Sequence, residues 1–294
     1  MRETILEFGP HHRLIGVLTR PESAERAGGG VAVVITNSGI IHRVGANRVH
    51  VRLARALAAA GVPCLRYDLP GIGDSARMSA GRDVETANQM ATAAALTALT
   101  AAGVASRFVM IGLCSGADHS FRVSVADPRV IGAVLIDPTT MFSTSRHRLN
   151  LALRAAGRAF RPRFWVRLLA GRYRLSRASL SASMHGEGPG APRSLRREEL
   201  PEQWAQARDA FQLLIDRKTK LLLLTTRHNG QVYSYRGQLQ DAFPELRGLR
   251  DILTTANRPR GEHTFSSEAD RDYLEATVLG WLAERILQRK ALTG

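Results

Sequence analysis

Cys114 stands in a sequence pattern that is typical of a catalytic nucleophile. The apolar run Arg107–Leu113 (RFVMIGL) predicts a buried strand, and it leads directly into Gly112-Leu113-Cys114-Ser115-Gly116 ahead of a predicted helix. Glycines on both sides permit a sharp strand-to-helix turn, which lifts the central side chain out of the sheet. A cysteine there lies at a helix N-terminus, where the helix dipole favours the thiolate. We therefore predict Cys114 as a nucleophile.

Two alternatives accompany this prediction. A free cysteine beside a turn of small residues is commonly a buried structural residue. Ser115 is the other candidate nucleophile in the turn, but it lies one position past the apex. Its backbone N–H is better placed to donate to an oxyanion, and we assign it that role.

The turn resembles the α/β-hydrolase family, with cysteine where the usual residue is serine. Dienelactone hydrolases are one branch with cysteine at this position. The stretch Gly112–Ala117 (GLCSGA) is also similar to small bacterial hydrolases associated with exosortase systems. A second stretch, Asp68–Ser75, matches the family's D-x-x-G-x-G-x-S turn. Gly71–Ala76 also fits a dinucleotide-binding fingerprint, but it lies mid-chain after Pro70 and lacks a following strand that ends in an acid.

The resemblance implies a second oxyanion donor in the loop that follows the predicted strand Val31–Thr36. That loop reads Asn37-Ser38-Gly39-Ile40, and the backbone N–H of Gly39 or Ile40 is the candidate. His42 and Arg43 come next. We predict that they line the substrate pocket, and the alternative is that they only cap or cover the following helix.

The resemblance also implies the order nucleophile, acid, base along the chain. The family's base is a histidine in the loop after the last strand. Arg250–Thr255 is predicted as that strand, and His263 lies just beyond it. We predict His263 as the general base. His119, one turn into the helix after Cys114, is assigned to packing.

The acid departs from the family pattern. The residues after the penultimate predicted strand, Lys220–Thr226, are Arg227–Gly230 (RHNG) and include no acid, so Asn229 is the best-matching position. Asp137 is the other candidate, because some branches of the family keep their acid after the strand predicted at Val130–Ile136; its alternative role is to cap that strand end. Asparagine can orient a histidine beside a cysteine nucleophile. A lost acid is also consistent with a catalytically degenerate protein.

Strand and helix patterns alternate along the chain and indicate how these residues are positioned. Predicted strands are Thr4–Phe8, Arg13–Thr19, Val31–Thr36, Cys64–Asp68, Arg107–Leu113, Val130–Ile136, Lys220–Thr226 and Arg250–Thr255. Predicted helices are Val49–Ala60, Val84–Ala102, Ala117–Val125, Glu202–Asp216 and Ser267–Leu287. This order favours an α/β-hydrolase fold, a mostly parallel sheet with helices on both faces. Residues 1–137 and 201–294 form the core, and residues 138–200 are predicted as a helical lid.

The net charge of +15 is concentrated in that insertion. Residues 146–197 contain thirteen arginines and one acid, Glu187. We expect one or two amphipathic helices within Arg146–Arg177, with their apolar sides over Cys114 and their arginines outward. The plain interpretation is a solvated basic face. Functional interpretations are an acidic acyl carrier protein or anionic lipid headgroups, whereas nucleic acid is not expected because no recognition motif is present.

Composition limits the class of protein. No apolar run is long enough for a transmembrane helix, the N-terminus lacks a signal-peptide pattern, and the cysteines Cys64 and Cys114 do not suggest a disulfide framework or a zinc site. We predict a cytoplasmic enzyme without metal or cofactor. Its predicted activity is Cys-dependent acyl transfer (thioesterase, acyltransferase or cyclase) on an ester or thioester through acyl-Cys114. The alternative is a degenerate protein that binds an anionic or carrier-linked ligand.

Overall fold

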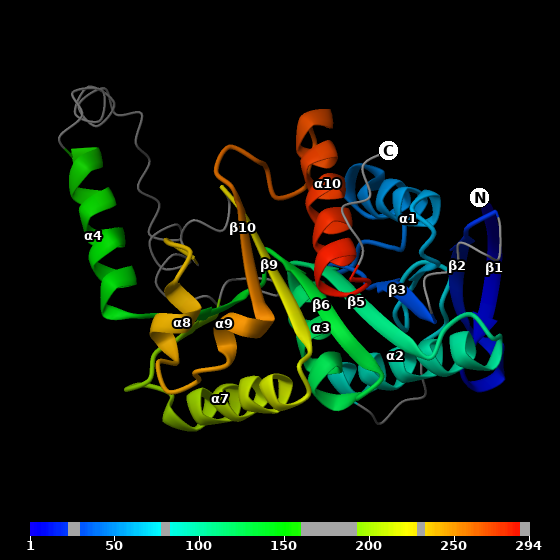
Figure 1. The fold of residues 1–294 in the computed structure, drawn as a ribbon, viewed down its shortest axis with the longest axis horizontal. Coiled ribbons are helices and arrows are strands. Elements are labelled where there is room, and N and C mark those ends of the chain that lie inside the picture. Colours follow the sequence, from blue (N-terminus) through cyan, green and yellow to red (C-terminus); the bar gives the residue numbers. More distant parts are fainter. Residues whose placement is uncertain (23–29, 78–82, 160–192, 228–232, 289–294) are drawn as a thin grey trace.

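A large mixed sheet organises the described part of the chain. The computed structural model describes residues 1–22, 30–77, 83–159, 193–227 and 233–288, which include an eight-stranded sheet of order β1-β2-β4-β3-β5-β6-β9-β10 (Figure 1). Its strands are β1 (Arg2–Phe8), β2 (Leu14–Arg20), β3 (Val31–Ile35), β4 (Cys64–Tyr67), β5 (Arg107–Leu113), β6 (Val130–Ile136), β9 (Lys220–Thr226) and β10 (Leu253–Arg258). β1 and β2 pair antiparallel, β2 pairs antiparallel with β4, and the six strands from β4 to β10 are mutually parallel. The predicted mostly parallel sheet is confirmed.

The central strands are apolar on both faces because helices cover both sides. All five residues of β3 are buried. Val33 packs into the core that includes Leu53 of α1 (Val49–Ala59), whereas Val34 packs into the core that includes Leu96 of α2 (Val84–Ala101). Successive side chains of a strand point to opposite faces, so one continuous apolar run contributes to two cores.

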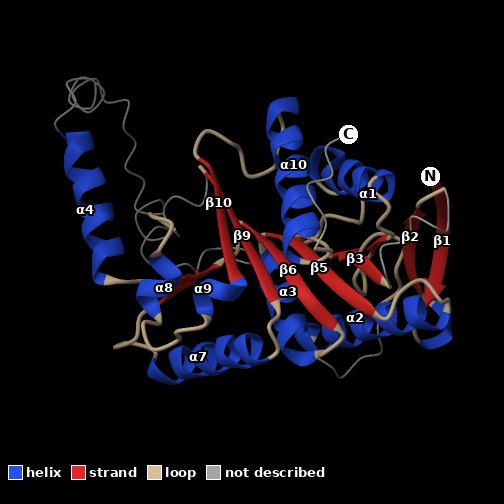
Figure 2. Ribbon diagram, in the orientation of Figure 1, coloured by secondary structure: helices blue, strands red, loops and turns tan. Residues whose placement is uncertain are grey.

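The helices form one layer on each face of the sheet. Figure 2 shows α1 and α10 (Glu268–Arg285) on one side and α2 and α7 (Pro201–Asp216) on the other. The helix that follows the turn at Cys114 is α3 (Ser115–Ala126), and we call this turn the elbow and α3 the elbow helix. α3 packs with α2 and α7. α10 begins at Ser267, whose hydroxyl accepts from the Asp270 N–H at 3.1 Å. Its large buried apolar residues recur at helical spacing, and they are Leu274, Val278, Trp281 and Leu282.

Several predicted boundaries differ from the structure by one to three residues, and two of these differences lie next to the site. Residues 249–252 form a short helix, α9 (Leu249–Ile252), and the last strand β10 starts at Leu253. Leu249 and Ile252 are buried and stand three residues apart, which suits one face of a helical turn better than a strand. The elbow helix begins at Ser115, two residues earlier than predicted.

The described part of the insertion comprises a small sheet and the helix α4, and the cover over Cys114 stays a prediction. β7 (Thr140–Phe142) and β8 (Arg193–Leu195) pair as a small parallel sheet, and α8 (Gln238–Ala242) packs against β7. α4 (Ser145–Ala159) lies beyond the β10 edge, away from β5 (Figure 1). Its Leu149 and Leu153 are 58% and 61% exposed, so these apolar side chains face solvent. Residues 160–192 of the predicted lid lie outside the described residues.

The described helices include none with the length and apolar character needed to cross a membrane. The cytoplasmic location stays a prediction.

Candidate active site

Cys114 occupies the apex of a strained turn between β5 and α3. Its backbone angles are φ 58° and ψ −124°, in a region that non-glycine residues rarely adopt. Its N–H donates to the Ile136 carbonyl at the end of β6 at 2.9 Å. A Cβ at Gly112 would lie 2.0 Å from the Gly116 carbonyl oxygen, and one at Gly116 would lie 2.3 Å from the Asn37 carbonyl oxygen. The two glycines are therefore required by close backbone contacts.

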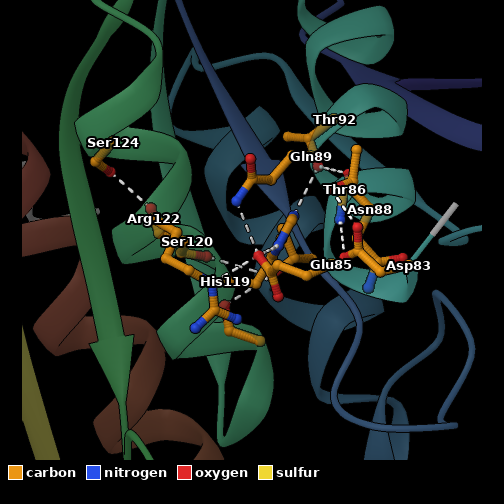
Figure 3. A network of polar contacts seen from close by, with 12 residues as sticks. Asp83, Glu85, Thr86, Asn88, Gln89, Thr92, His119, Ser120, Arg122 and Ser124 are labelled. Atoms are coloured by element: carbon orange, nitrogen blue, oxygen red, sulfur yellow. Dashed lines mark hydrogen bonds and ion pairs between the residues drawn. The ribbon is translucent and has the colours of Figure 1, made fainter. Parts of the chain in front are cut away.

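A polar network fixes the elbow helix against α2. His119 Nε2 lies 2.8 Å from Thr92 Oγ1, and Arg122 Nε donates to Glu85 Oε1 at 2.6 Å (Figure 3). Thr92 Oγ1 also lies 2.6 Å from the hydroxyl of Tyr67 on β4. His119 is 3% exposed and is engaged in this network, as the packing assignment predicted. The network holds α3, and with it the turn that carries Cys114.

His263 and Asp137 meet at the edge formed by the ends of β6, β9 and β10. His263 Nδ1 lies 2.9 Å from Asp137 Oδ2. Asp137 is 2% exposed and has a positive φ of 44°. Thr226, at the end of β9, donates to its carboxylate from the backbone N–H at 2.7 Å and from the hydroxyl at 2.6 Å. Asp137 therefore caps the ends of two strands, and its carboxylate also contacts the predicted base, while its catalytic role stays a prediction.

The surroundings of His263 favour its protonated form. Hydrogen bonding with Asp137 and with Cys114 raises the pKa of His263 from 6.5 to about 9, against the opposing effect of burial. A cationic imidazole next to a thiol stabilises the thiolate by charge attraction. The structure therefore brings together Cys114, His263 and Asp137, which the sequence places far apart. Asn229, the other predicted orienting residue, lies outside the described residues.

The predicted oxyanion loop is fastened to the elbow by Ser115. The Gly39 N–H donates to Ser115 Oγ at 2.8 Å, and Ser38 Oγ donates to the Leu113 carbonyl at 2.7 Å. The loop therefore contacts the residues on both sides of Cys114, and its role as an oxyanion donor stays a prediction. Of its two candidate donors, Gly39 already has its N–H bound to the serine hydroxyl, and Ile40 has a side chain that is 93% exposed. This bond was not predicted, because no local pattern relates a loop to a hydroxyl 76 residues away.

Arg43 joins two loops through aspartates. Its backbone N–H donates to Asp68 Oδ1 at 2.6 Å, and its guanidinium binds the side chains of Asp68 and Asp74. Asp68 is fully buried, and a Cβ at Gly73 would lie 2.3 Å from its Oδ2. The D-x-x-G-x-G-x-S stretch therefore supplies a partly buried ion pair that fixes the loop after β3. His42 is exposed, and substrate binding by His42 and Arg43 stays a prediction.

Metal binding finds no support in the described ranges. They contain no group of three or more histidine, cysteine, aspartate or glutamate side chains that could hold an ion.

Comparison with known proteins gives the same architecture. The sequence model of the Alpha/beta hydrolase family matches residues 40–293. No curated protein sequence matches the chain. Among solved structures, it is similar to XC6422 from Xanthomonas campestris, described as an a/b serine hydrolase without lid, at a TM-score of 0.52 and 16% identity over 100% of this chain and 96% of that one.

Two esterases show a similar likeness. Est1E from Butyrivibrio proteoclasticus has a TM-score of 0.56 and 11% identity, over 96% of this chain and 98% of that one. The Pyrococcus furiosus esterase PF2001 has a TM-score of 0.57 and 13% identity, over 97% of this chain and 91% of that one. The fold class predicted from the sequence is confirmed.

Proposed function

Because the chain belongs to the alpha/beta hydrolase family, we propose that it catalyses acyl transfer through a thioester formed on Cys114. The observation that carries the proposal is the contact between His263 and Asp137, with Cys114 as the second hydrogen-bonding partner of the imidazole. Such a constellation activates a sulfur nucleophile and supplies a proton to the leaving group. The substrate is an ester or a thioester.

The reaction proceeds in two halves. The Cys114 thiolate attacks the carbonyl carbon, and the C=O electron pair moves to oxygen, where the backbone N–H groups of Ser115 and Ile40, or of Gly39 once it releases Ser115 Oγ, stabilise the charge. The tetrahedral intermediate collapses, the bond to the leaving alkoxide or thiolate breaks, and His263 gives that group its proton. Water or another acceptor then gives a proton to His263 and attacks the acyl carbon, and Cys114 departs as thiolate.

Asp137 accounts for the acid that the chain lacks after β9. The alternative of a degenerate binding protein rested on that lack. A buried carboxylate 2.9 Å from His263 orients the imidazole and stabilises its cationic form, so the geometry favours an enzyme. Hydrolysis, transfer to another acceptor and cyclisation share the acyl-enzyme half of this mechanism.

Thiol alkylation tests the proposal, because the two cysteines are a matched pair. Cys64 is fully buried in β4, and burial raises the pKa of its thiol, whereas Cys114 is partly exposed. We expect iodoacetamide to alkylate Cys114 at pH 6–7 and to abolish ester hydrolysis in parallel, while Cys64 stays unmodified. If Cys114 is alkylated only near pH 8.5, as an ordinary thiol is, then its thiol is not activated and the proposal is contradicted.

A separate proposal concerns delivery of the acyl group. The basic segment 146–197 supports docking of an acidic acyl carrier protein, and Arg146 on α4 is 67% exposed with its guanidinium over the Tyr235 ring. Charge attraction between the two proteins would make kcat/KM for a carrier-bound thioester fall steeply with ionic strength. The matched control is the same acyl group on a small uncharged thiol. Equal salt dependence for both substrates would contradict docking.

A further inference from the structure

A cavity of about 190 Å³ lies on the α3 and α7 face of the sheet. Its apolar lining comes from β6 and β9, from β7 and from α7, and includes Leu135, Leu221, Leu223, Phe142, Ala207 and Phe211. The catalytic residues are not part of its wall. The cavity lies where the core meets the short strands β7 and β8 of the insertion.

The α3 wall of the cavity leads toward Cys114. That wall consists of Ala117, Asp118, Phe121 and Arg122, which follow Cys114 by three, four, seven and eight residues. These spacings place residues on one face of a helix, and Cys114 stands at the N-terminal end of that face. The wall also approaches Asp137, because Leu135 on β6 and Pro138 just after it line the cavity two residues before and one residue after Asp137. The cavity therefore runs along the two segments that carry the nucleophile and the acid.

The polar groups at the cavity wall are already bonded within the protein. The Asp118 carboxylate accepts from the N–H groups of Thr139 and Thr140 at 3.1 and 3.2 Å and from the Thr139 hydroxyl. The Tyr233 hydroxyl donates to the Thr140 carbonyl at 3.3 Å. Arg122 is turned toward Glu85 on α2 (Figure 3). A ligand in this cavity thus meets mainly hydrocarbon, and the negative charge of Asp118 disfavours a carboxylate.

We infer that this cavity holds the apolar acyl group of the substrate, an inference that rests on the proposed function. An apolar protein cavity of about 150 Å³ is known to accept benzene, so about 190 Å³ suits an uncharged group of roughly six to eight carbons. In this arrangement the acyl chain of the substrate extends from the reacting carbonyl at Cys114 along α3 into the cavity. Each methylene that enters the cavity should raise kcat/KM roughly fourfold until the cavity is full.

The test is a series of p-nitrophenyl esters from acetate to dodecanoate. We expect kcat/KM to rise to an optimum at hexanoate or octanoate. Ala207→Leu on α7 places a larger side chain in the cavity and should move the optimum to shorter chains. Ala205→Leu is the matched control, because residue 205 lies outside the lining and about 200° around the helix from residue 207. Leu239→Ala on α8 enlarges the cavity and should move the optimum to longer chains, so the test does not depend on one variant folding.

Binding of n-octanol to Cys114→Ala separates the cavity from the chemistry. We expect saturable binding by calorimetry, reduced at least tenfold in Cys114→Ala/Ala207→Leu and retained in Cys114→Ala/Ala205→Leu. If octanol binds in this way but wild type does not turn over any ester, the proposed function is wrong, and the cavity remains a binding site for an apolar chain. Turnover at equal kcat/KM for all chain lengths, with octanol binding unaffected by Ala207→Leu, would overturn the cavity inference and leave the proposed function standing.

Discussion

His263 Nδ1 lies 2.9 Å from Asp137 Oδ2, although the two residues are 126 positions apart in the sequence. The contact exists because β6 and β9 are neighbours in the sheet and β10 follows β9. Asp137 extends the end of β6, Thr226 at the end of β9 holds its carboxylate, and the loop after β10 brings the imidazole to it. The Asp137 carboxylate and the His263 imidazole are thus joined across three adjacent strand ends.

Removing the charge of Asp137 should lower the pKa of His263. In Asp137→Asn we expect the imidazole to titrate well below about 9, because the largest contribution to its raised pKa is lost. NMR titration of the His263 ring measures this directly, and kcat/KM should fall by roughly 10²–10⁴-fold. Thr226→Val is the control, since it removes one hydrogen bond and keeps the carboxylate. An unchanged pKa in Asp137→Asn would show that the contact does not tune the base.

The raised pKa of His263 makes stability depend on pH. Its pKa in the folded chain, about 9, exceeds its ordinary value of 6.5, so the protonated imidazole stabilises the fold. This contribution is complete below pH 6.5 and disappears as the pH rises through about 9. We expect the difference in unfolding free energy between wild type and His263→Gln to shrink over that interval in urea titrations. A difference that is constant with pH would contradict the raised pKa.

The elbow glycines should tolerate no side chain. Gly116→Ala forces a Cβ against the Asn37 carbonyl oxygen, so it should cost roughly 1–3 kcal/mol or more and displace the oxyanion loop. Gly280→Ala in α10 is the matched control, because its Cβ would meet no atom within 4 Å and alanine favours a helix by up to about 1 kcal/mol. Urea unfolding of both variants measures the contrast. Equal stability of the two would mean that the turn is looser than described.

Ser115 should hold the oxyanion loop in place. Ser115→Ala removes the acceptor of the Gly39 N–H, a bond worth about 1 kcal/mol, so amide exchange in residues 38–41 should rise about fivefold. Hydrogen–deuterium exchange with peptide-level mass analysis reports this change. Ser124→Ala, which removes a bond within the same helix α3, should leave the loop unaffected. Protection of residues 38–41 that survives Ser115→Ala would show that other contacts fix the loop.

Features that depend on neighbouring residues in the sequence, such as the buried strands and the turn at Cys114, could be predicted from local sequence patterns. β5, β6 and β9 were placed to the residue because uninterrupted apolar runs between turn residues leave little freedom. β10 was placed three residues early, because the predicted strand included Ile252 and the helical spacing of Leu249 and Ile252 was not used. The turn at Cys114 could be recognised from the glycines around it. These glycines are needed because a Cβ at either position would collide with backbone atoms within or beside the turn.

Long-range contacts decided the remaining features. The sequence left Asn229 and Asp137 as alternatives, because which strand end faces the histidine loop depends on the strand order. The ion pairs of Arg43 likewise join residues about 25 to 31 positions apart, so the basic side chain that was predicted to line the pocket is bound to Asp68 and Asp74.

Trapping the acyl-enzyme tests the central claim most directly. Wild type is mixed with p-nitrophenyl butyrate, quenched with acid within the first turnover, and analysed by intact mass and peptide mapping. We predict one butyryl group on Cys114 in wild type and in Cys64→Ala, and none in Cys114→Ala. An adduct of equal amount in Cys114→Ala, or ester turnover by that variant at the wild-type rate, would contradict catalysis through the Cys114 sulfur.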